Sequence, residues 1–193
     1  MPDTRTTLSA QRPPHAPADH PAVSQGKTGV LLVNLGTPDG TDYWSMRRYL
    51  SEFLSDRRVI ELTFRPKKSA AAYKKVWMEE GSPLLVYTKR QAEKLAARIG
   101  SEQLIVDFAM NYGNPSIASK IEKLKDLGCE KIAVVALYPQ YSATTTASVY
   151  DRTFDELKKL RWQPAVRTAA PFFEMPAYVE ALATSIETHI AGL

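Results

Sequence analysis

Four short apolar runs punctuate the chain and alternate with longer stretches of helical pattern. The runs occupy residues 28–34, 103–110, 131–137 and 164–172, and β-branched residues are frequent in them. Apolar runs of this length without strict polar alternation are typical of strands buried on both faces of a sheet. We therefore predict that these four segments form the strands of one sheet.

The segments between the runs carry apolar residues at helical spacing. After turn residues at 35–41, either Thr41 or Asp42 can cap a first helix. Its apolar positions recur three and four residues apart: Met46, Tyr49, Leu50, Phe53 and Leu54. Further helices are predicted over 66–78, 83–100, 115–128 and 145–160, and a last one ends at Ile190.

Strand, loop and helix repeat four times, which predicts an α/β fold. The expected architecture is a doubly wound, mainly four-stranded parallel sheet flanked by helices on both faces. In such sheets the loops that follow the strands gather at one edge, where ligands bind. The loops 35–41, 111–116 and 138–146 are therefore expected to share one rim.

Composition sets the domain organisation. The chain has 193 residues, of which 44% are hydrophobic and 24% charged, values typical of one globular domain. Residues 1–26 are rich in proline, histidine and alanine and are predicted to be a disordered tail before an α/β domain at 27–193. The tail lacks the apolar core of a signal peptide, and the apolar runs are too short to cross a bilayer. We expect a cytoplasmic protein with at most peripheral membrane contact.

Charge is unevenly distributed. The net charge is +4, yet residues 47–75 contain nine basic and three acidic side chains. This excess indicates an anionic partner, although solvated helix faces explain it equally well. Binding of nucleic acid is not expected, because no nucleic-acid-binding motif and no interleaved exposed aromatic residues accompany the basic segment.

The rim loops carry the candidate chemistry. The loop "LGTPDGT" resembles a phosphate cradle but lacks both the Gly-Lys-Ser/Thr ending and the three spaced glycines, so a tight turn is the commoner explanation. The loop "YPQYSATTT" places phenol rings and hydroxyls before a helix, which suits a planar apolar ligand carrying carboxylates. Its hydroxyls can equally serve only to cap that helix.

Groups for metal binding or covalent catalysis are scarce. Cys129 is the sole cysteine, and only His189 lies inside the predicted domain. We find no spaced histidine pair, no cysteine pair and no nucleophile motif. The residues alone therefore predict a ligand-binding domain with no catalytic residue and no metal ligand of its own.

Four blocks together carry a family resemblance. They are "LLVNLGTPDGTDYWSMRRYLSEFLSDRRVIE", "GSPLLVYTKRQAEKL", "MNYGNPSI" and "YPQYSATTTAS". In this order and spacing, from about Lys27 to the end, they resemble the N-terminal half of proteobacterial ferrochelatases. The resemblance implies one of two similar α/β domains, with the second absent from this chain. It also implies insertion of ferrous iron into protoporphyrin IX to give protohaem, the last step of haem biosynthesis.

The same resemblance implies that both iron and porphyrin are substrates and that no cofactor is required. The invariant histidine and its acidic partner belong to the family's second domain, so this chain would supply the porphyrin-binding half. A separate C-terminal half is a further expected partner. Asn111 stands where some members of the family have arginine.

The resemblance assigns porphyrin contacts to eight positions. Leu35 matches a position whose side chain faces the porphyrin plane, and an arginine at 65 would pair with a propionate. The complete set is Leu35, Arg65, Tyr73, Ser82, Tyr138, Gln140, Tyr141 and Ser142.

Two other functions remain open from the sequence. One is a free-standing α/β module that binds porphyrin or haem without inserting a metal. The other is a related chelatase acting on sirohydrochlorin or cobalt, which would need histidines on the rim where this chain has none.

Overall fold

The computed structural model describes residues 10–11, 17, 19, 23–24, 26–59 and 66–192. In chain order the elements are β1 (Ala10–Gln11), β2 (Val23–Ser24), β3 (Lys27–Thr37), α1 (Tyr43–Leu54), α2 (Pro66–Val76), α3 (Pro83–Ile99), β4 (Leu104–Gly113), α4 (Ile117–Asp126), β5 (Cys129–Ala136), the π-helical turn η1 (Ala143–Ala147), α5 (Ser148–Lys159), β6 (Ala165–Thr168) and α6 (Pro176–Ile190).

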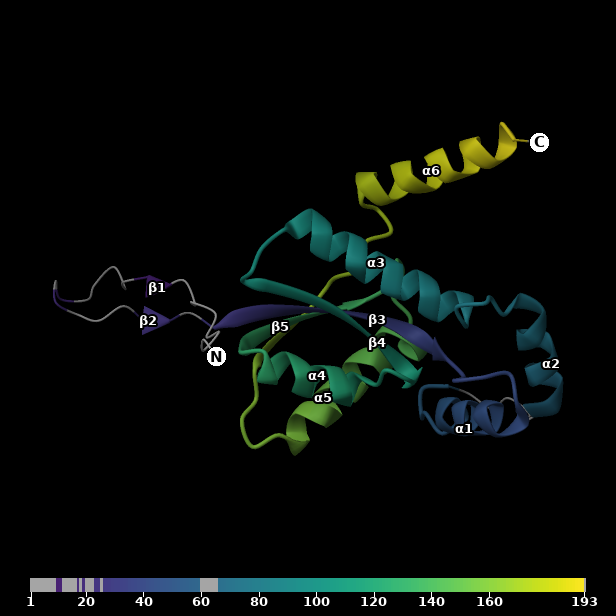
Figure 1. Ribbon diagram of the computed structural model, residues 1–193, viewed down its shortest axis with the longest axis horizontal. Helices are drawn as coiled ribbons and strands as arrows, with labels where there is room; N and C mark the ends of the chain where they lie inside the picture. The colour runs from purple at the N-terminus through teal and green to yellow at the C-terminus, as the bar shows by residue number, and fades with distance from the viewer. Residues whose placement is uncertain are drawn as a thin grey trace, which may run out of the picture.

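The main sheet has four parallel strands in the order β4–β3–β5–β6. Helix α3 covers one face, and α4 and α5 cover the other (Figure 1). The predicted fold class is therefore confirmed. A separate antiparallel pair joins β1 and β2 within the predicted tail. Most of that tail lies outside the described residues, and its disorder stays a prediction.

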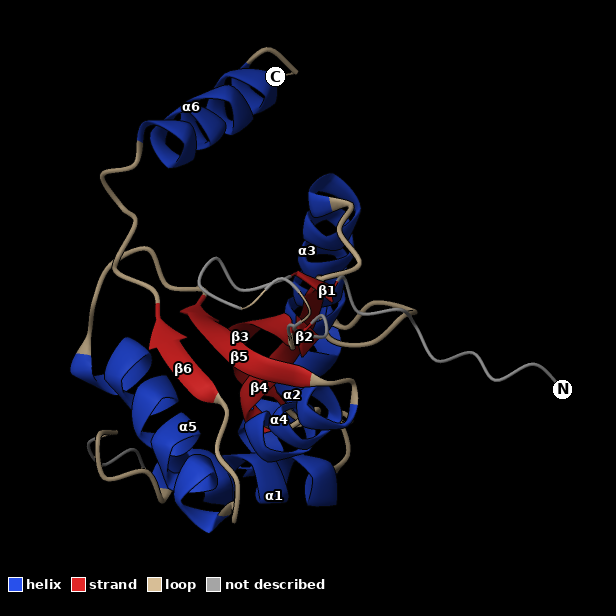
Figure 2. Ribbon diagram, turned by 90° about the vertical axis from the view of Figure 1, so that its left-hand side faces the viewer, coloured by secondary structure: helices blue, strands red, loops and turns tan. Residues whose placement is uncertain are grey.

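The core lies between the sheet and the pair α4–α5. Leu31 and Val33 of β3 and Val134 of β5 are fully buried there, and Ile121 and Leu124 of α4 pack against them. Burial of β3 from both sides follows from the uninterrupted apolar run that predicted this strand. The core therefore fixes β3 inside the sheet, with its carboxyl end pointing toward α1 and α2 (Figure 1). Figure 2 shows α3 and α5 on opposite sides of the strands.

The helix ends follow capping chemistry. Of the two predicted caps of α1, Asp42 is the one used, because its carboxylate accepts hydrogen bonds from the backbone N–H groups of Trp44 and Ser45 at 2.9 and 3.0 Å. Helix α3 begins at Pro83 and ends at Ile99, and it is capped by Gly100 in the left-handed conformation with φ 56°.

The two strands β3 and β4 are longer than predicted. The residues expected to form turns after them, 35–37 and 111–113, remain in the strands. Gly36 and Gly113 make this possible, since they adopt φ angles of 110° and 81° and let the two backbones approach closely. A Cβ atom on Gly36 would lie 1.9 Å from the backbone oxygen of Tyr112. The glycines serve strand pairing at the rim.

Candidate functional site

The carboxyl ends of β3, β4 and β5 meet at one edge of the sheet, as predicted. Beyond this edge stand α1 and α2, and between them and the strands lies a second hydrophobic cluster, which we call the rim cluster (Figure 1). Its buried members are Met46, Tyr49 and Tyr112, and its half-buried members are Leu35, Leu50, Phe53, Ala70 and Tyr73.

Two of the predicted porphyrin contacts, Leu35 and Tyr73, belong to the rim cluster. The ring of Tyr73 meets the ring of Tyr49 edge-on at a centroid distance of 6.3 Å, and the centroid of the Trp77 ring lies 6.5 Å from that of Tyr73. Tyr49 in turn donates a hydrogen bond from Oη to the backbone oxygen of Gly36 at 3.2 Å. The structure thus brings together, on one aromatic surface, residues that are 38 positions apart in the chain.

The loop after β5 contains four predicted contacts. Tyr138 is half-buried and packs on the sheet core, whereas Gln140 and Tyr141 are exposed. Ser142 accepts a hydrogen bond from the backbone N–H of Thr144 at 3.3 Å and so caps η1. The structural role considered for these hydroxyls therefore holds for Ser142. The predicted helix at 145–160 begins with this π-helical turn, and its α-helical part starts at Ser148.

Of the two remaining predicted contacts, Ser82 and Arg65, the structure describes only Ser82. Ser82 is buried directly before the first turn of α3, and Thr88 of the same helix accepts a hydrogen bond from Asn34 Nδ2 at 3.0 Å. This bond ties the start of α3 to the end of β3 and so places Ser82 near the rim. Arg65 lies outside the described residues.

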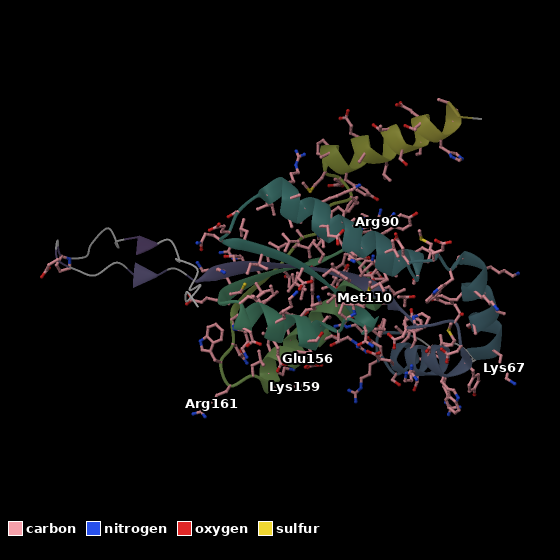
Figure 3. The ribbon with its side chains drawn as sticks, in the orientation of Figure 1. Lys67, Arg90, Met110, Glu156, Lys159 and Arg161 are labelled. Atoms are coloured by element: carbon pink, nitrogen blue, oxygen red, sulfur yellow. The ribbon has the colours of Figure 1, made fainter. Side chains whose placement is uncertain are left out.

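Part of the basic excess at 47–75 is neutralised by acidic residues from other segments. Arg48 lies 3.9 Å from Asp39, and Arg58 pairs with Asp151 of α5. Lys67 points away from the domain on α2, in agreement with a solvated helix face (Figure 3). Ion pairing of this kind between exposed groups contributes little to stability.

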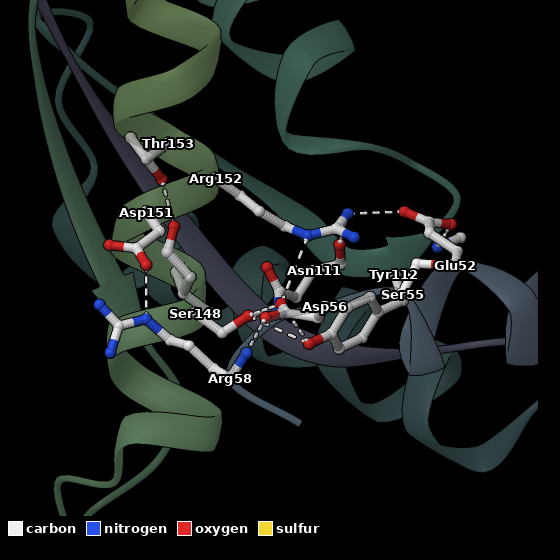
Figure 4. Close-up of polar contacts among 12 residues, drawn as sticks. Glu52, Ser55, Asp56, Arg58, Asn111, Tyr112, Ser148, Asp151, Arg152 and Thr153 are labelled. Carbon is white, nitrogen blue, oxygen red and sulfur yellow. Dashed lines mark hydrogen bonds and ion pairs between the residues drawn. The ribbon is translucent and has the colours of Figure 1, made fainter. Parts of the chain in front are cut away.

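A polar network under the rim was not predicted from the sequence. Asp56 accepts hydrogen bonds from Ser148 Oγ and from Tyr112 Oη, the second at 2.8 Å (Figure 4). Asn111 Nδ2 donates to Ser148 Oγ at 2.8 Å. Burial alone raises the pKa of the Asp56 carboxyl, but the bonds from Ser148, from the backbone of Arg58 and from Tyr112 together hold that pKa below its ordinary value.

Arg152 of α5 extends the same network. Its Nη1 atom donates to Glu52 Oε1 and to the backbone oxygen of Asn111, both at 2.6 Å. Its guanidinium carbon lies 4.5 Å from the centroid of the Tyr112 ring, within the range of a cation–π contact. Glu52 Oε2 also accepts from the backbone N–H of Gly113 at 2.9 Å. The network thereby joins α1, β4 and α5 beneath the candidate site.

Burial raises the pKa of three phenols at the rim, those of Tyr49, Tyr112 and Tyr138. Burial, with Tyr73 as the next cause, raises the pKa of Tyr49, and burial likewise raises the pKa of Tyr138. Burial and the nearby Asp56 carboxylate raise the pKa of Tyr112 to about 12. A flat, apolar ligand would therefore meet neutral aromatic groups along this edge.

Three buried polar atoms have no hydrogen-bond partner among the described residues: Thr37 Oγ1, Asn111 Oδ1 and Tyr138 Oη. They belong to the carboxyl ends of β3 and β4 and to the loop after β5, three neighbouring strands. Buried polar groups are nearly always paired, so three unpaired groups at one edge require an explanation. Thr37 also lines a cavity of about 240 Å³ together with Tyr49 and Glu52.

Metal ligands do not converge within the described ranges, where no group of three or more histidine, cysteine or acidic side chains could hold an ion. Cys129 is buried in the core, and His189 is exposed on α6. In the same part of the chain, no helix combines the length and apolar character needed to span a bilayer.

Fold and rim together define an α/β domain with an aromatic cluster at the carboxyl edge of its parallel sheet. Comparison with known proteins makes the class specific, because a model of the ferrochelatase family matches residues 27–193. The chain belongs to the ferrochelatase family, which confirms the resemblance found in the sequence.

Relatives within the family include curated bacterial proteins. Ferrochelatase from Agrobacterium fabrum (strain C58) is 54% identical over 194 residues, covering 92% of this chain and 56% of that protein. Ferrochelatase from Rhizobium meliloti (strain 1021) is 54% identical over 195 residues, covering 92% of this chain and 58% of the relative. The chain therefore spans about half the length of these relatives.

Proposed function

We propose that this chain supplies the porphyrin-binding part of a ferrochelatase, the enzyme that inserts ferrous iron into protoporphyrin IX to form protohaem. Family membership supports the choice of substrate. The observation that carries the location of the site is the set of three unpaired buried polar atoms, on Thr37, Asn111 and Tyr138, at the ends of neighbouring strands. The contacts assigned to Arg65, Ser82, Gln140 and Tyr141 form part of the same proposal.

The rim residues suit binding of the porphyrin ring. A porphyrin presents a flat apolar ring system, and aromatic side chains such as Tyr73 and Tyr49 pack well against such surfaces. Pyrrole N–H groups and propionates supply hydrogen-bond donors and acceptors that can pair with amide and hydroxyl groups. Arg65 is proposed to bind a propionate through a charge-assisted hydrogen bond.

Removal of the pyrrole protons needs other groups than those that bind the ring. Metal insertion releases two pyrrole protons, so it needs a base near the ring centre. The raised pKa values of Tyr49, Tyr112 and Tyr138 keep these phenols protonated at neutral pH. The carboxylate of Asp56 already accepts hydrogen bonds from Ser148 and Tyr112, and its pKa is lowered, so it is a weak base. We therefore propose that the base and the iron-handling groups come from the other half of the enzyme.

Titration of the chain with protoporphyrin IX tests the proposed site. Tyr138→Phe removes a buried hydroxyl without a partner in the unliganded chain, so its removal is expected to raise the free energy of unfolding by about 1 kcal/mol. The same change is expected to weaken porphyrin binding about fivefold, because the ligand then loses one hydrogen bond. Soret absorbance measures porphyrin binding, and urea denaturation measures the free energy of unfolding.

Tyr87→Phe, on the exposed side of α3, is the matched control and should change neither the porphyrin affinity nor the stability. Unchanged porphyrin affinity in Tyr138→Phe would contradict the proposed site.

A second measurement separates a half-enzyme from a free-standing porphyrin-binding module. The chain is mixed with protoporphyrin IX and ferrous iron under anaerobic conditions, and metal insertion is followed by absorbance. We expect a porphyrin spectral shift without metal insertion by the chain alone, because no metal-ligating cluster converges in its described part. Insertion that appears only after addition of the C-terminal half of a ferrochelatase supports the half-enzyme. A spectral shift that never leads to insertion supports the module.

A further inference from the structure

One ion pair contacts three consecutive residues at the carboxyl end of β4. Arg152 Nη1 lies 2.6 Å from Glu52 Oε1 and donates a second hydrogen bond to the backbone oxygen of Asn111, also at 2.6 Å (Figure 4). The guanidinium of Arg152 covers the ring of Tyr112 at 4.5 Å. Glu52 Oε2 accepts from the backbone N–H of Gly113 at 2.9 Å. We call the pair of Glu52 and Arg152 the β4 clamp.

The end of β4 has little restraint from the sheet itself. The strand lies at the edge of the sheet, so it has a neighbouring strand, β3, on one side only. Gly113, at its last position, adopts φ 81°, and glycine loses more conformational freedom on folding than other residues. The β4 clamp restrains this strand end from α1 and α5.

The β4 clamp also sets the position of α1 against the strands. Glu52 lies on α1 next to Phe53, whose ring meets that of Tyr112 edge-on at 5.0 Å. One turn earlier on the same helix, Tyr49 contacts Tyr73, a predicted porphyrin contact, at 6.3 Å. A shift of α1 away from β4 would therefore move both helical aromatic residues and, with them, the aromatic surface of the rim cluster.

The bonding of the β4 clamp distinguishes it from an ordinary surface ion pair. Both of its side chains are half-buried, and each also binds a backbone group of β4. Hydrogen bonds that involve a charged group are stronger and more directional than neutral ones. The pair of Glu156 and Lys159, at 2.7 Å, offers a contrast, because it joins neighbouring turns of α5 alone. Only the first pair fixes separate elements relative to one another.

We propose that Glu52 and Arg152 are positioning residues for porphyrin binding. Neither belongs to the predicted porphyrin contacts, and they act through Tyr112 and α1 by holding the aromatic surface at the spacing that the flat ring requires. The inference rests on the proposed function, since it assigns these two residues a role in the same site.

Chemical rescue tests the role of Arg152. Arg152→Ala is expected to weaken binding of protoporphyrin IX about tenfold, measured by Soret absorbance, because the hydrogen bonds from its charged group are lost. Arg152 lines a cavity of about 670 Å³, so added methylguanidinium can reach the vacated position. Methylguanidinium chloride at a non-denaturing concentration is expected to restore the affinity to within about threefold. Sodium chloride at the same ionic strength should not restore it.

Lys159→Ala is the matched control. It removes a basic side chain from the same cavity, about two turns further along α5, and should change the porphyrin affinity less than about twofold. Hydrogen exchange of the Gly113 amide provides a readout without porphyrin. This amide is expected to exchange faster in Arg152→Ala and to slow again with methylguanidinium, whereas a loss of overall stability would not be reversed by that cation.

Glu52→Gln provides a second variant that keeps the shape of the side chain. It removes the charge of the acceptor and is expected to weaken porphyrin binding about fivefold, without rescue by methylguanidinium. Unchanged affinity in both variants, or a loss in Arg152→Ala that methylguanidinium leaves in place, would overturn the positioning role while the unchanged chain still binds porphyrin. Absence of porphyrin binding by the unchanged chain would contradict the proposed function itself, and with it this role.

Discussion

Replacing Gly36 with alanine is expected to remove most of the stability of the domain. Gly36 adopts φ 110°, and a Cβ atom there would lie 1.9 Å from the backbone oxygen of Tyr112 in the adjacent strand. The clash is with backbone inside a parallel ladder, so relief requires β3 and β4 to separate. We expect the free energy of unfolding to fall by more than about 4 kcal/mol, a large share of that of a typical domain. Urea denaturation followed by circular dichroism measures it.

Gly81 provides a matched control for the glycine prediction. Its φ of 119° is close to that of Gly36, but no atom lies within 4 Å of the position of its Cβ. Gly81→Ala therefore reports only the cost of the backbone conformation, about 1–3 kcal/mol. Equal urea midpoints for the two variants would show that the close approach of β3 and β4 does not limit stability.

Replacing Asp56 with alanine is expected to have the second largest effect. The change leaves Ser148 Oγ, Tyr112 Oη and the backbone N–H of Arg58 without their shared acceptor. Loss of such a buried acceptor is expected to lower the free energy of unfolding by about 2–3 kcal/mol at pH 7. Asp155→Ala, which removes an exposed carboxylate from α5, is the control and should leave the urea midpoint unchanged.

The Asp56 effect should depend on pH in a defined direction. The folded-state pKa of Asp56 lies below its ordinary value, so the carboxylate stabilises the fold fully above about pH 4, the usual pKa of an unfolded aspartate. This stabilisation is lost as the pH falls through the lowered value. The difference in unfolding free energy between the unchanged chain and Asp56→Ala should therefore shrink below pH 4. A difference that stays constant down to pH 2 would contradict the proposed role of the ionised carboxylate.

Hydrophobic pattern predicted the sheet and the order of its elements because the apolar runs of β3, β4 and β5 supply the buried residues of the sheet. The fourth run forms only the short edge strand β6, which is mostly exposed, so its predicted burial on both faces was wrong. The ends of β3 and β4 were wrong by three residues each, since glycine and asparagine normally indicate turns. Here Gly36 and Gly113 allow the strands to continue instead. Such a use of glycine depends on the neighbouring strand, which local sequence does not reveal.

Only part of the candidate site was predictable from the sequence. Parallel topology places the loops after β3, β4 and β5 at one edge, and that much followed from the order of elements. The hydrogen bond between Asp56 and Ser148, by contrast, joins residues 92 positions apart, and the ion pair of Arg152 with Glu52 spans 100. No short motif contains either pair, so only the folded structure could reveal them.

The hydrogen bond from Phe172 to Pro139 has a consequence for communication within the molecule. It makes the base of α6 and the loop of Tyr138 to Ser142 one mechanical unit. A partner bound at α6 and a porphyrin bound at the loop would then change each other's binding affinity by the same factor, as thermodynamic reciprocity requires.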